Sequence, residues 1–124
     1  MSVGQGTITV IKIFDSEVLA ASGTATSAVI PLDEIKSDGF FSIQFEATGS
    51  GTLTTEYQLS NNDGLDNKPG TYLTPTGASD ITTAAAAGND IISFNPELAK
   101  KMKIKITEAG GANSITVSAW LCIQ

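Results

Sequence analysis

The sequence contains no histidine, no arginine and only one cysteine, Cys122. Without histidine the commonest general base and metal ligand is missing, and Ser-His and Cys-His nucleophile pairs are excluded. A single cysteine excludes an intrachain disulfide, and a thiol within a strand pattern is more often packed than reactive. No P-loop, GxGxxG or CxxC pattern occurs. We therefore expect neither an enzyme nor a bound cofactor.

Positive charge and long apolar runs are also scarce. Seven lysines stand against 13 acids, for a net charge of −6, whereas nucleic-acid binders need cations to replace the counterions on phosphate. No apolar run approaches the roughly 18 residues of a membrane span. The first residues lack the basic and apolar regions of a secretion signal. We expect no nucleic-acid partner, no membrane partner and no signal peptide.

Threonine, serine and glycine are abundant, with 15, 12 and 12 residues, and they suit half-exposed strands and tight turns. Several short segments alternate apolar and polar residues, most clearly residues 40–47, 52–60, 102–107 and 114–123. A length of 124 residues fits one domain. We predict an all-β, antiparallel β-sandwich of jelly-roll type, formed by residues 1–124 with a flexible arm at residues 1–6.

One segment favours a helix. Asn95-Pro96-Glu97 combines an N-cap residue, a proline suited to the first helical position and an acid near the positive end of the helix dipole. We expect a short helical turn near residues 96–101.

The strands at residues 40–47 and 52–60 are separated by Thr48-Gly49-Ser50-Gly51. We interpret them as an antiparallel hairpin with Glu46 and Glu56 on its exposed face. Two neighbouring carboxylates resemble a glycosidase arrangement, but acids on a solvated strand face are common. A minor enzyme using this pair is our least favoured alternative.

The longest polar loop, residues 61–70, is rich in oxygen ligands. Asn62, Asp63 and Asp66 are candidate calcium ligands, although the bidentate glutamate of an EF-hand is missing. Asparagine and aspartate are also good turn formers, and we favour a structural turn.

Two features of the C-terminal third suggest contact surfaces. Lys101, Lys103 and Lys105 share one strand face, which is consistent with a solvated strand, with edge protection or with contact to the acidic face of another subunit. Trp120, the only tryptophan, lies opposite the regular apolar side of its strand. It belongs either to a second buried face or to an interface, where tryptophan is enriched.

The C-terminal two thirds resemble small proteins encoded among the structural genes of tailed bacteriophages and prophages. The resemblance covers residues 38–124 and is carried by strand and turn motifs. They are Phe45-Glu46-Ala47-Thr48-Gly49-Ser50-Gly51, Glu56-Tyr57-Gln58-Leu59-Ser60-Asn61, Ile91-Ile92-Ser93-Phe94-Asn95-Pro96-Glu97-Leu98-Ala99, Met102-Lys103-Ile104-Lys105-Ile106-Thr107-Glu108 and Ser118-Ala119-Trp120-Leu121. The resemblance implies a β-sandwich protein of the virion, such as a head decoration protein or a head or tail accessory protein, made in the host cytoplasm.

These observations predict a non-enzymatic virion protein whose partners are other virion proteins and further copies of itself. A trimer is the arrangement we expect from the symmetry of such lattices. The alternative is a carbohydrate-binding module that stacks sugars on Trp120, Tyr57 or Tyr72 and uses the 61–70 loop for calcium.

Overall fold

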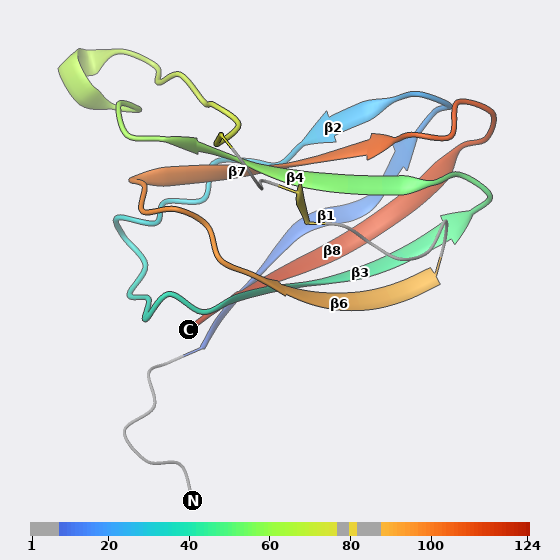
Figure 1. Cartoon of the computed structure of the whole chain (residues 1–124), viewed down its shortest axis with the longest axis horizontal. Helices are drawn as coiled ribbons and strands as arrows, with labels where there is room; N and C mark the ends of the chain where they lie inside the picture. Colours follow the sequence, from blue (N-terminus) through green and yellow to red (C-terminus); the bar gives the residue numbers. More distant parts are fainter. Residues whose placement is uncertain (1–7, 77–79, 82–87) are drawn as a thin grey trace, which may run out of the picture.

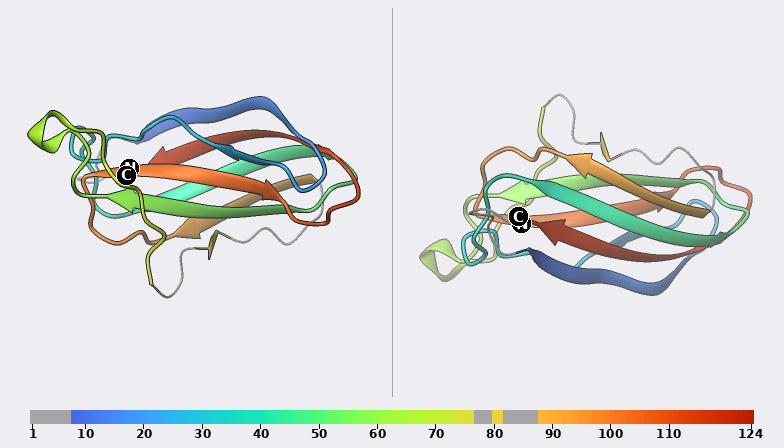
Figure 2. Two further views of the ribbon diagram at one scale, coloured as in Figure 1. Left: turned by 90° about the horizontal axis from the view of Figure 1, so that it is seen from above. Right: turned by 90° about the horizontal axis from the view of Figure 1, so that it is seen from below.

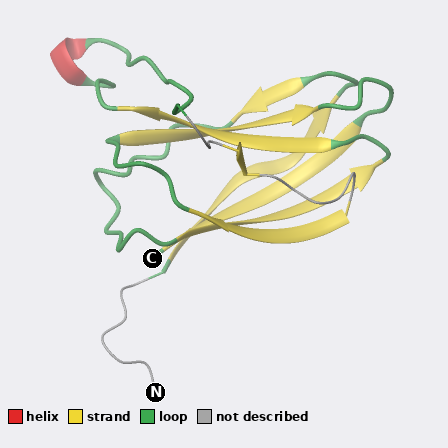
Figure 3. Cartoon of the chain, viewed as in Figure 1, coloured by secondary structure: helices red, strands yellow, loops and turns green. Residues whose placement is uncertain are grey.

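The alternating segments of the sequence become strands of two stacked sheets (Figure 1). The computed structural model describes residues 8–76, 80–81 and 88–124, which are almost entirely strand and loop (Figure 3). The strands are β1 (Thr9–Leu19), β2 (Thr24–Thr26), β3 (Phe41–Gly49), β4 (Leu53–Ser60), β5 (Asp80–Ile81), β6 (Gly88–Phe94), β7 (Lys101–Glu108) and β8 (Ile115–Ile123). A single 3₁₀ turn, η1 (Leu65–Asn67), interrupts the long loop after β4. The predicted arm at residues 1–6 lies outside the described residues.

The two sheets have a jelly-roll topology. One sheet has the order β1-β8-β3-β6 and the other β2-β7-β4-β5, and every strand pair is antiparallel. The two views of Figure 2 show one sheet from each side of the sandwich. Consecutive strands mostly lie in opposite sheets, so the chain passes repeatedly from one layer to the other. The predicted all-β sandwich is confirmed, and its jelly-roll character follows from this strand order.

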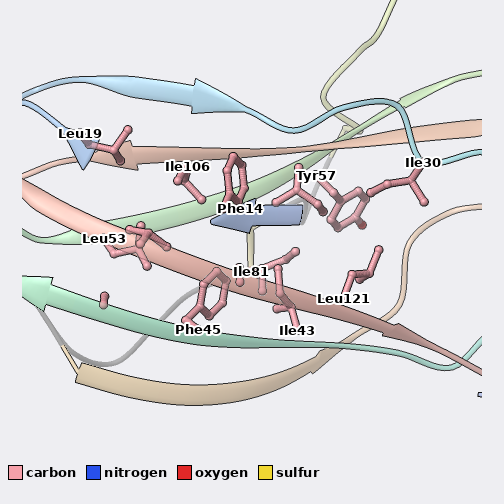
Figure 4. Close-up of a cluster of buried hydrophobic side chains, with 14 of the residues drawn as sticks. Phe14, Leu19, Ile30, Ile43, Phe45, Leu53, Tyr57, Ile81, Ile106 and Leu121 are labelled. Carbon is pink, nitrogen blue, oxygen red and sulfur yellow. The ribbon is translucent and has the colours of Figure 1, made fainter. Parts of the chain in front are cut away.

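The core lies between the sheets and is formed by the inward residues of each strand (Figure 4). In β7, Met102, Ile104 and Ile106 are completely buried, while the lysines between them are not. In β8, Val117, Ala119 and Leu121 face the same interior. This period-two alternation is what a sheet with one dry face requires.

The geometry of β1 explains why apolar and polar residues alternate imperfectly in its sequence. Its pairing with β8 shifts register between Lys12 and Phe14 and again between Phe14 and Glu17. Ser16 adopts a left-handed conformation there, with φ of 52°. Because each shift turns the following residues to the other face, Phe14 is buried although Val10 and Lys12 point outward. The imperfect alternation of this segment is therefore a sign of bulges.

The predicted hairpin of residues 40–47 and 52–60 is wrong. β3 pairs with β6 and β8, and β4 pairs with β5 and β7, so the two strands belong to different sheets. The connection between them crosses the end of the sandwich, helped by Gly49 at a φ of 109°. A Cβ at this position would lie 2.8 Å from the Ser114 carbonyl oxygen. Glycine is therefore required by the crossing and not by a hairpin turn.

The predicted helical turn near residues 96–101 is also wrong. The segment from Asn95 to Lys100 contains no helix and leads from β6 in one sheet to β7 in the other. Packed sheets are about 10 Å apart, and an extended chain rises about 3.3 Å per residue against 1.5 Å in a helix. The side chain of Glu97 accepts a hydrogen bond from Tyr57, and Asn61 accepts one from the Lys100 N–H. The crossing and its contacts override the local helix preference.

Candidate interaction surfaces

Trp120 lies on the outer face of the β1-β8-β3-β6 sheet, half-buried between its neighbours. Lys12 of β1 and Gln44 of β3 stand opposite it on the two flanking strands. The Lys12 ammonium is 5.2 Å from the centre of the Trp120 ring and also forms an ion pair with Asp15. Such a cation–π contact stabilises an exposed site by about 0.5–1 kcal/mol. Trp120 is therefore held in place on an outer surface and does not belong to a second core.

Other apolar groups share this outer face. Val10 and Ile91 are 60% and 65% exposed. Cys122 faces outward and lines a hollow of about 280 Å³ whose rim includes Ile8 and Phe40. The face is therefore a mixed surface in which apolar side chains alternate with Ser, Gln and Glu, as in transient protein interfaces.

The three predicted interface lysines lie on β7, which is a central strand between β2 and β4. The interpretation of edge protection is therefore wrong. Lys101 pairs with Asp33 and Glu34, at 3.2 and 3.7 Å. The hydrogen bond with Asp33 raises the pKa of Lys101 above its ordinary value.

The other two lysines also have partners within the chain. The Lys103 ammonium lies 4.3 Å from the centre of the Tyr72 ring. Lys105 stands opposite Glu56 in the sheet, and their charged atoms are 3.9 Å apart. Because each lysine already meets an acid or an aromatic ring, the row is less available to another subunit than the sequence suggests.

The 61–70 loop uses its polar side chains to hold its own shape. Asn62 Oδ1 accepts hydrogen bonds from Ser60 Oγ and the Thr71 N–H. Asp63 accepts from the Gly70 N–H and from the Tyr72 hydroxyl, and the Tyr72 bond lowers its pKa. Asp66 lies in η1. Two of the three candidate calcium ligands thus act as braces of the loop.

Within the described ranges, no three Cys, Asp or Glu side chains are grouped so that they could hold a metal ion. Calcium binding by Asn62, Asp63 and Asp66 stays a prediction.

Glu46 and Glu56 do not face each other. They lie on β3 and β4, in different sheets, and neither is buried. Glu46 accepts a hydrogen bond from Gln44, and Glu56 meets Lys105. The carboxylate pair that the supposed hairpin would have created is therefore absent from the fold.

Glu108 forms a polar brace that the sequence analysis missed. Its side chain is 1% exposed and accepts hydrogen bonds from the N–H groups of Ser22, Thr52, Gly110 and Gly111, at 2.8–3.0 Å. These backbone N–H groups, first among them Ser22, lower its pKa to about 2. The carboxylate ties together the β1–β2, β3–β4 and β7–β8 connections at one end of the sandwich (Figure 1). An acid that continues the apolar side of β7 was the available sequence sign.

The opposite end of the sandwich is hollowed and presents exposed apolar side chains beside its polar loops, and we call it the apolar end. Leu98, on the crossing between β6 and β7, is 99% exposed. It lines two adjacent hollows of about 350 and 390 Å³. Several other exposed apolar residues belong to the start of β1 or to loops at this end: Ile8, Val10, Val29, Phe40, Leu65 and Leu73. The sequence did not reveal this surface because Leu98 was expected on a short helical turn.

The edges of the β1-β8-β3-β6 sheet differ. β1 is bulged, whereas β6 pairs with β3 over seven residues without a register shift. On this regular edge strand, Asp90 Oδ1 accepts a hydrogen bond from the N–H of Ile91, at 2.9 Å. Bulges and inward-pointing charges are means by which native sheets avoid edge-to-edge pairing.

Among the described residues, no helix has the length and apolar character needed to cross a membrane. No protein-family model and no curated protein matches the sequence.

One solved structure shows a similar fold, and two others align less well. A chain of infectious bursal disease virus, Gx strain, aligns with a TM-score of 0.51 and 18% identity over 94% of this chain and 31% of the viral chain. This chain thus spans less than a third of the viral chain. A chain of the Gt strain aligns with a TM-score of 0.42 and 15% identity over 94% of this chain and 32% of the viral one. PirA aligns with a TM-score of 0.43 and 15% identity over 98% of both chains. These last two likenesses carry no argument, and the first shows the fold alone.

Proposed function

We propose that this chain is a non-enzymatic structural protein of a viral particle. More specifically, we propose a capsid decoration protein or a head or tail accessory protein of a tailed bacteriophage, made in the host cytoplasm and located in the virion. The observation that carries the proposal is a jelly-roll sandwich whose outer face exposes Trp120, Val10 and Ile91 among polar side chains. The resemblance in residues 38–124 supports the phage origin. Jelly rolls are frequent in viral capsid domains, and the likeness to part of a viral chain agrees with that setting.

The outer face of the β1-β8-β3-β6 sheet supplies the contact to the particle. Trp120 is a preordered aromatic anchor there, because Lys12 and Gln44 flank it, and interface energy is concentrated in such residues. Individual contacts of this kind are weak. Repetition over a symmetric lattice, and association of the copies with one another, multiplies them into stable attachment.

The test is to add the purified protein to particles that lack it and to measure bound copies by quantitative mass spectrometry and electron microscopy. We expect saturable binding at symmetry-related positions. Trp120→Ala should raise the concentration needed for half-saturation at least tenfold, because truncating an interface anchor costs about 2 kcal/mol or more. Thr54→Ala, an exposed change on the other sheet, is the matched control. Absence of the protein from particles, or binding without saturation, would refute the proposal.

A carbohydrate-binding module is the second candidate, because jelly rolls also occur in lectins and Trp120 faces outward. Its other two stacking residues are poorly placed, since Tyr57 is 3% exposed and Lys103 lies over the ring of Tyr72. A glycan array decides between the two. Retention that Trp120→Ala or a calcium chelator abolishes would favour the sugar-binding function over the virion role.

A further inference from the structure

We propose that the apolar end of the sandwich is a two-fold interface in which Leu98 of each copy inserts into the hollow beside Leu98 of the other. The inference deepens the proposed function, on which it rests, by naming one partner as a second copy of this chain and by locating the contact.

An exposed apolar side chain, Leu98, stands beside an open apolar hollow. Leu98 is 99% exposed, more than any other large apolar residue in the described part of the chain. The hollow next to it measures about 350 Å³, and Leu32, Ile35, Phe41 and Pro96 line it. Ser37 and Glu97 also line it, but most of its lining is apolar, and it is large enough to receive an isobutyl side chain. Leucine left in water and an apolar hollow left open are both unfavourable, and one contact relieves both.

The position of this projecting side chain, the knob, relative to the hollow indicates the symmetry of the contact. Leu98 itself belongs to the lining of the hollow, so the two features lie side by side on one surface. A head-to-tail ring requires knob and hollow on different faces of the subunit, whereas a two-fold contact uses the same face twice. Only the two-fold arrangement fills the hollow of each copy with Leu98 of the other copy at the same time. It favours a dimer at this site over the trimer expected from the symmetry of virion lattices.

The loop beside the hollow also carries charged residues of both signs. Glu34, Lys36 and Asp38 are exposed on the loop that supplies Leu32 and Ile35 to the hollow. These charges alternate in sign along the chain between residues that line the hollow, although Glu34 also lies 3.7 Å from Lys101 of its own chain. When two copies meet across a two-fold axis, Lys36 of one can approach Asp38 of the other, so the loop is complementary in charge to its own copy.

A stable interface also requires enough contact area on each copy. A standard interface buries roughly 800 Å² per partner, a little over a tenth of the 6995 Å² surface of this chain. The end of the sandwich also presents Phe40, Leu65 and Leu73, which are 64%, 50% and 64% exposed. A contact centred on Leu98 therefore has neighbouring apolar surface through which it can extend.

The test is the mass of the full chain in solution by sedimentation equilibrium, from micromolar to millimolar concentration. We expect twice the 12.8 kDa chain mass for the wild type and for Val18→Asp, an exposed apolar control on β1 near the opposite end. Leu98→Asp should raise the dimer dissociation constant at least a hundredfold. Because Leu98 is fully exposed, this change leaves the fold intact, and circular dichroism checks that it does.

A cross-linking experiment tests the symmetry. Leu98→Cys in a Cys122→Ser background, treated with a short bismaleimide, should give a covalent dimer in high yield, because a two-fold contact brings the single thiols of the two copies together, whereas a head-to-tail contact keeps them apart. A monomeric wild type at millimolar concentration, a dimer that Leu98→Asp leaves unchanged, or a trimeric mass would each overturn the inference. Binding of the protein to particles is measured separately. A monomer that still decorates particles would therefore refute the dimer while leaving the proposed function standing.

Discussion

The hydroxyl of Tyr57 donates a hydrogen bond to Glu97 Oε1 across 2.7 Å, joining β4 to the crossing between β6 and β7. The Tyr57 ring also stacks on Phe94, with 5.7 Å between the ring centres. The contact fixes Glu97, and its neighbour Leu98 remains fully exposed. One buried tyrosine thus helps to shape the apolar end of the sandwich.

The first prediction concerns the two tyrosines. Burial, followed by the hydrogen bond to Glu97, raises the pKa of Tyr57 from 10.0 to about 12. Burial and Asp63 also raise the pKa of Tyr72. Because the neutral form is favoured in the fold, this stabilisation is complete below pH 10 and is lost as the pH rises through about 12. In a spectrophotometric titration at 25 °C, tyrosinate absorbance should stay low at pH 10.5.

The control for this titration is the protein unfolded in urea, in which both tyrosines should ionise near pH 10. Ionisation of half the tyrosine at pH 10 in the folded protein would contradict the burial of Tyr57.

The second prediction concerns Glu108. Its pKa falls from 4.5 to about 2 because four backbone N–H groups bind the carboxylate. A lowered pKa gives stability that is present above pH 4.5 and is lost as the pH falls towards 2. Glu108→Gln should lower the urea midpoint at pH 7 and flatten the loss of stability between pH 5 and pH 2. Glu17→Gln, an exposed change on β1, should alter neither the urea midpoint nor its pH dependence. If Glu17→Gln and Glu108→Gln had equal effects, Glu108 would not act as a brace.

The third prediction separates the core from the outer face. Ile104 is 0% exposed and stands opposite Tyr57, whereas Ile91 is 65% exposed on β6. Ile104→Ala should reduce the free energy of unfolding by about 2–5 kcal/mol, since it leaves a cavity. Ile91→Ala should cost no more than about 1 kcal/mol, the range of strand propensity. Urea denaturation measures both, and similar losses would mean that the two sheets are not stacked as described.

The fourth prediction concerns β6, which is an edge strand among the described strands of its sheet. Asp90→Ala removes the acceptor of the Ile91 N–H and the charge beside it. A regular apolar edge strand is a template for pairing with another chain, so the variant should form larger assemblies at concentrations where the wild type does not. Light scattering and thioflavin binding measure the change. Glu46→Ala removes the same charge from β3 in the interior of the sheet; if it aggregates equally, lost net charge is the cause and the edge argument fails.

The phage resemblance predicted a β-sandwich, and the jelly roll agrees with it. The site residues could be predicted only in part. Trp120 was correctly separated from the apolar side of β8, because parity along a strand is a local property. Glu108 and Leu98 could not be assigned in the same way, since their roles depend on loops from distant parts of the chain.

The sequence by itself determined four strands, at residues 40–47, 52–60, 102–107 and 114–123, and which side of each is buried. Alternation of Phe41, Ile43 and Phe45 with polar residues required a strand with one dry face, whatever its neighbours. Only the tertiary structure decided which strands pair. The same alternation fits a hairpin and a crossing between sheets, and the choice depends on how all eight strands close around one core.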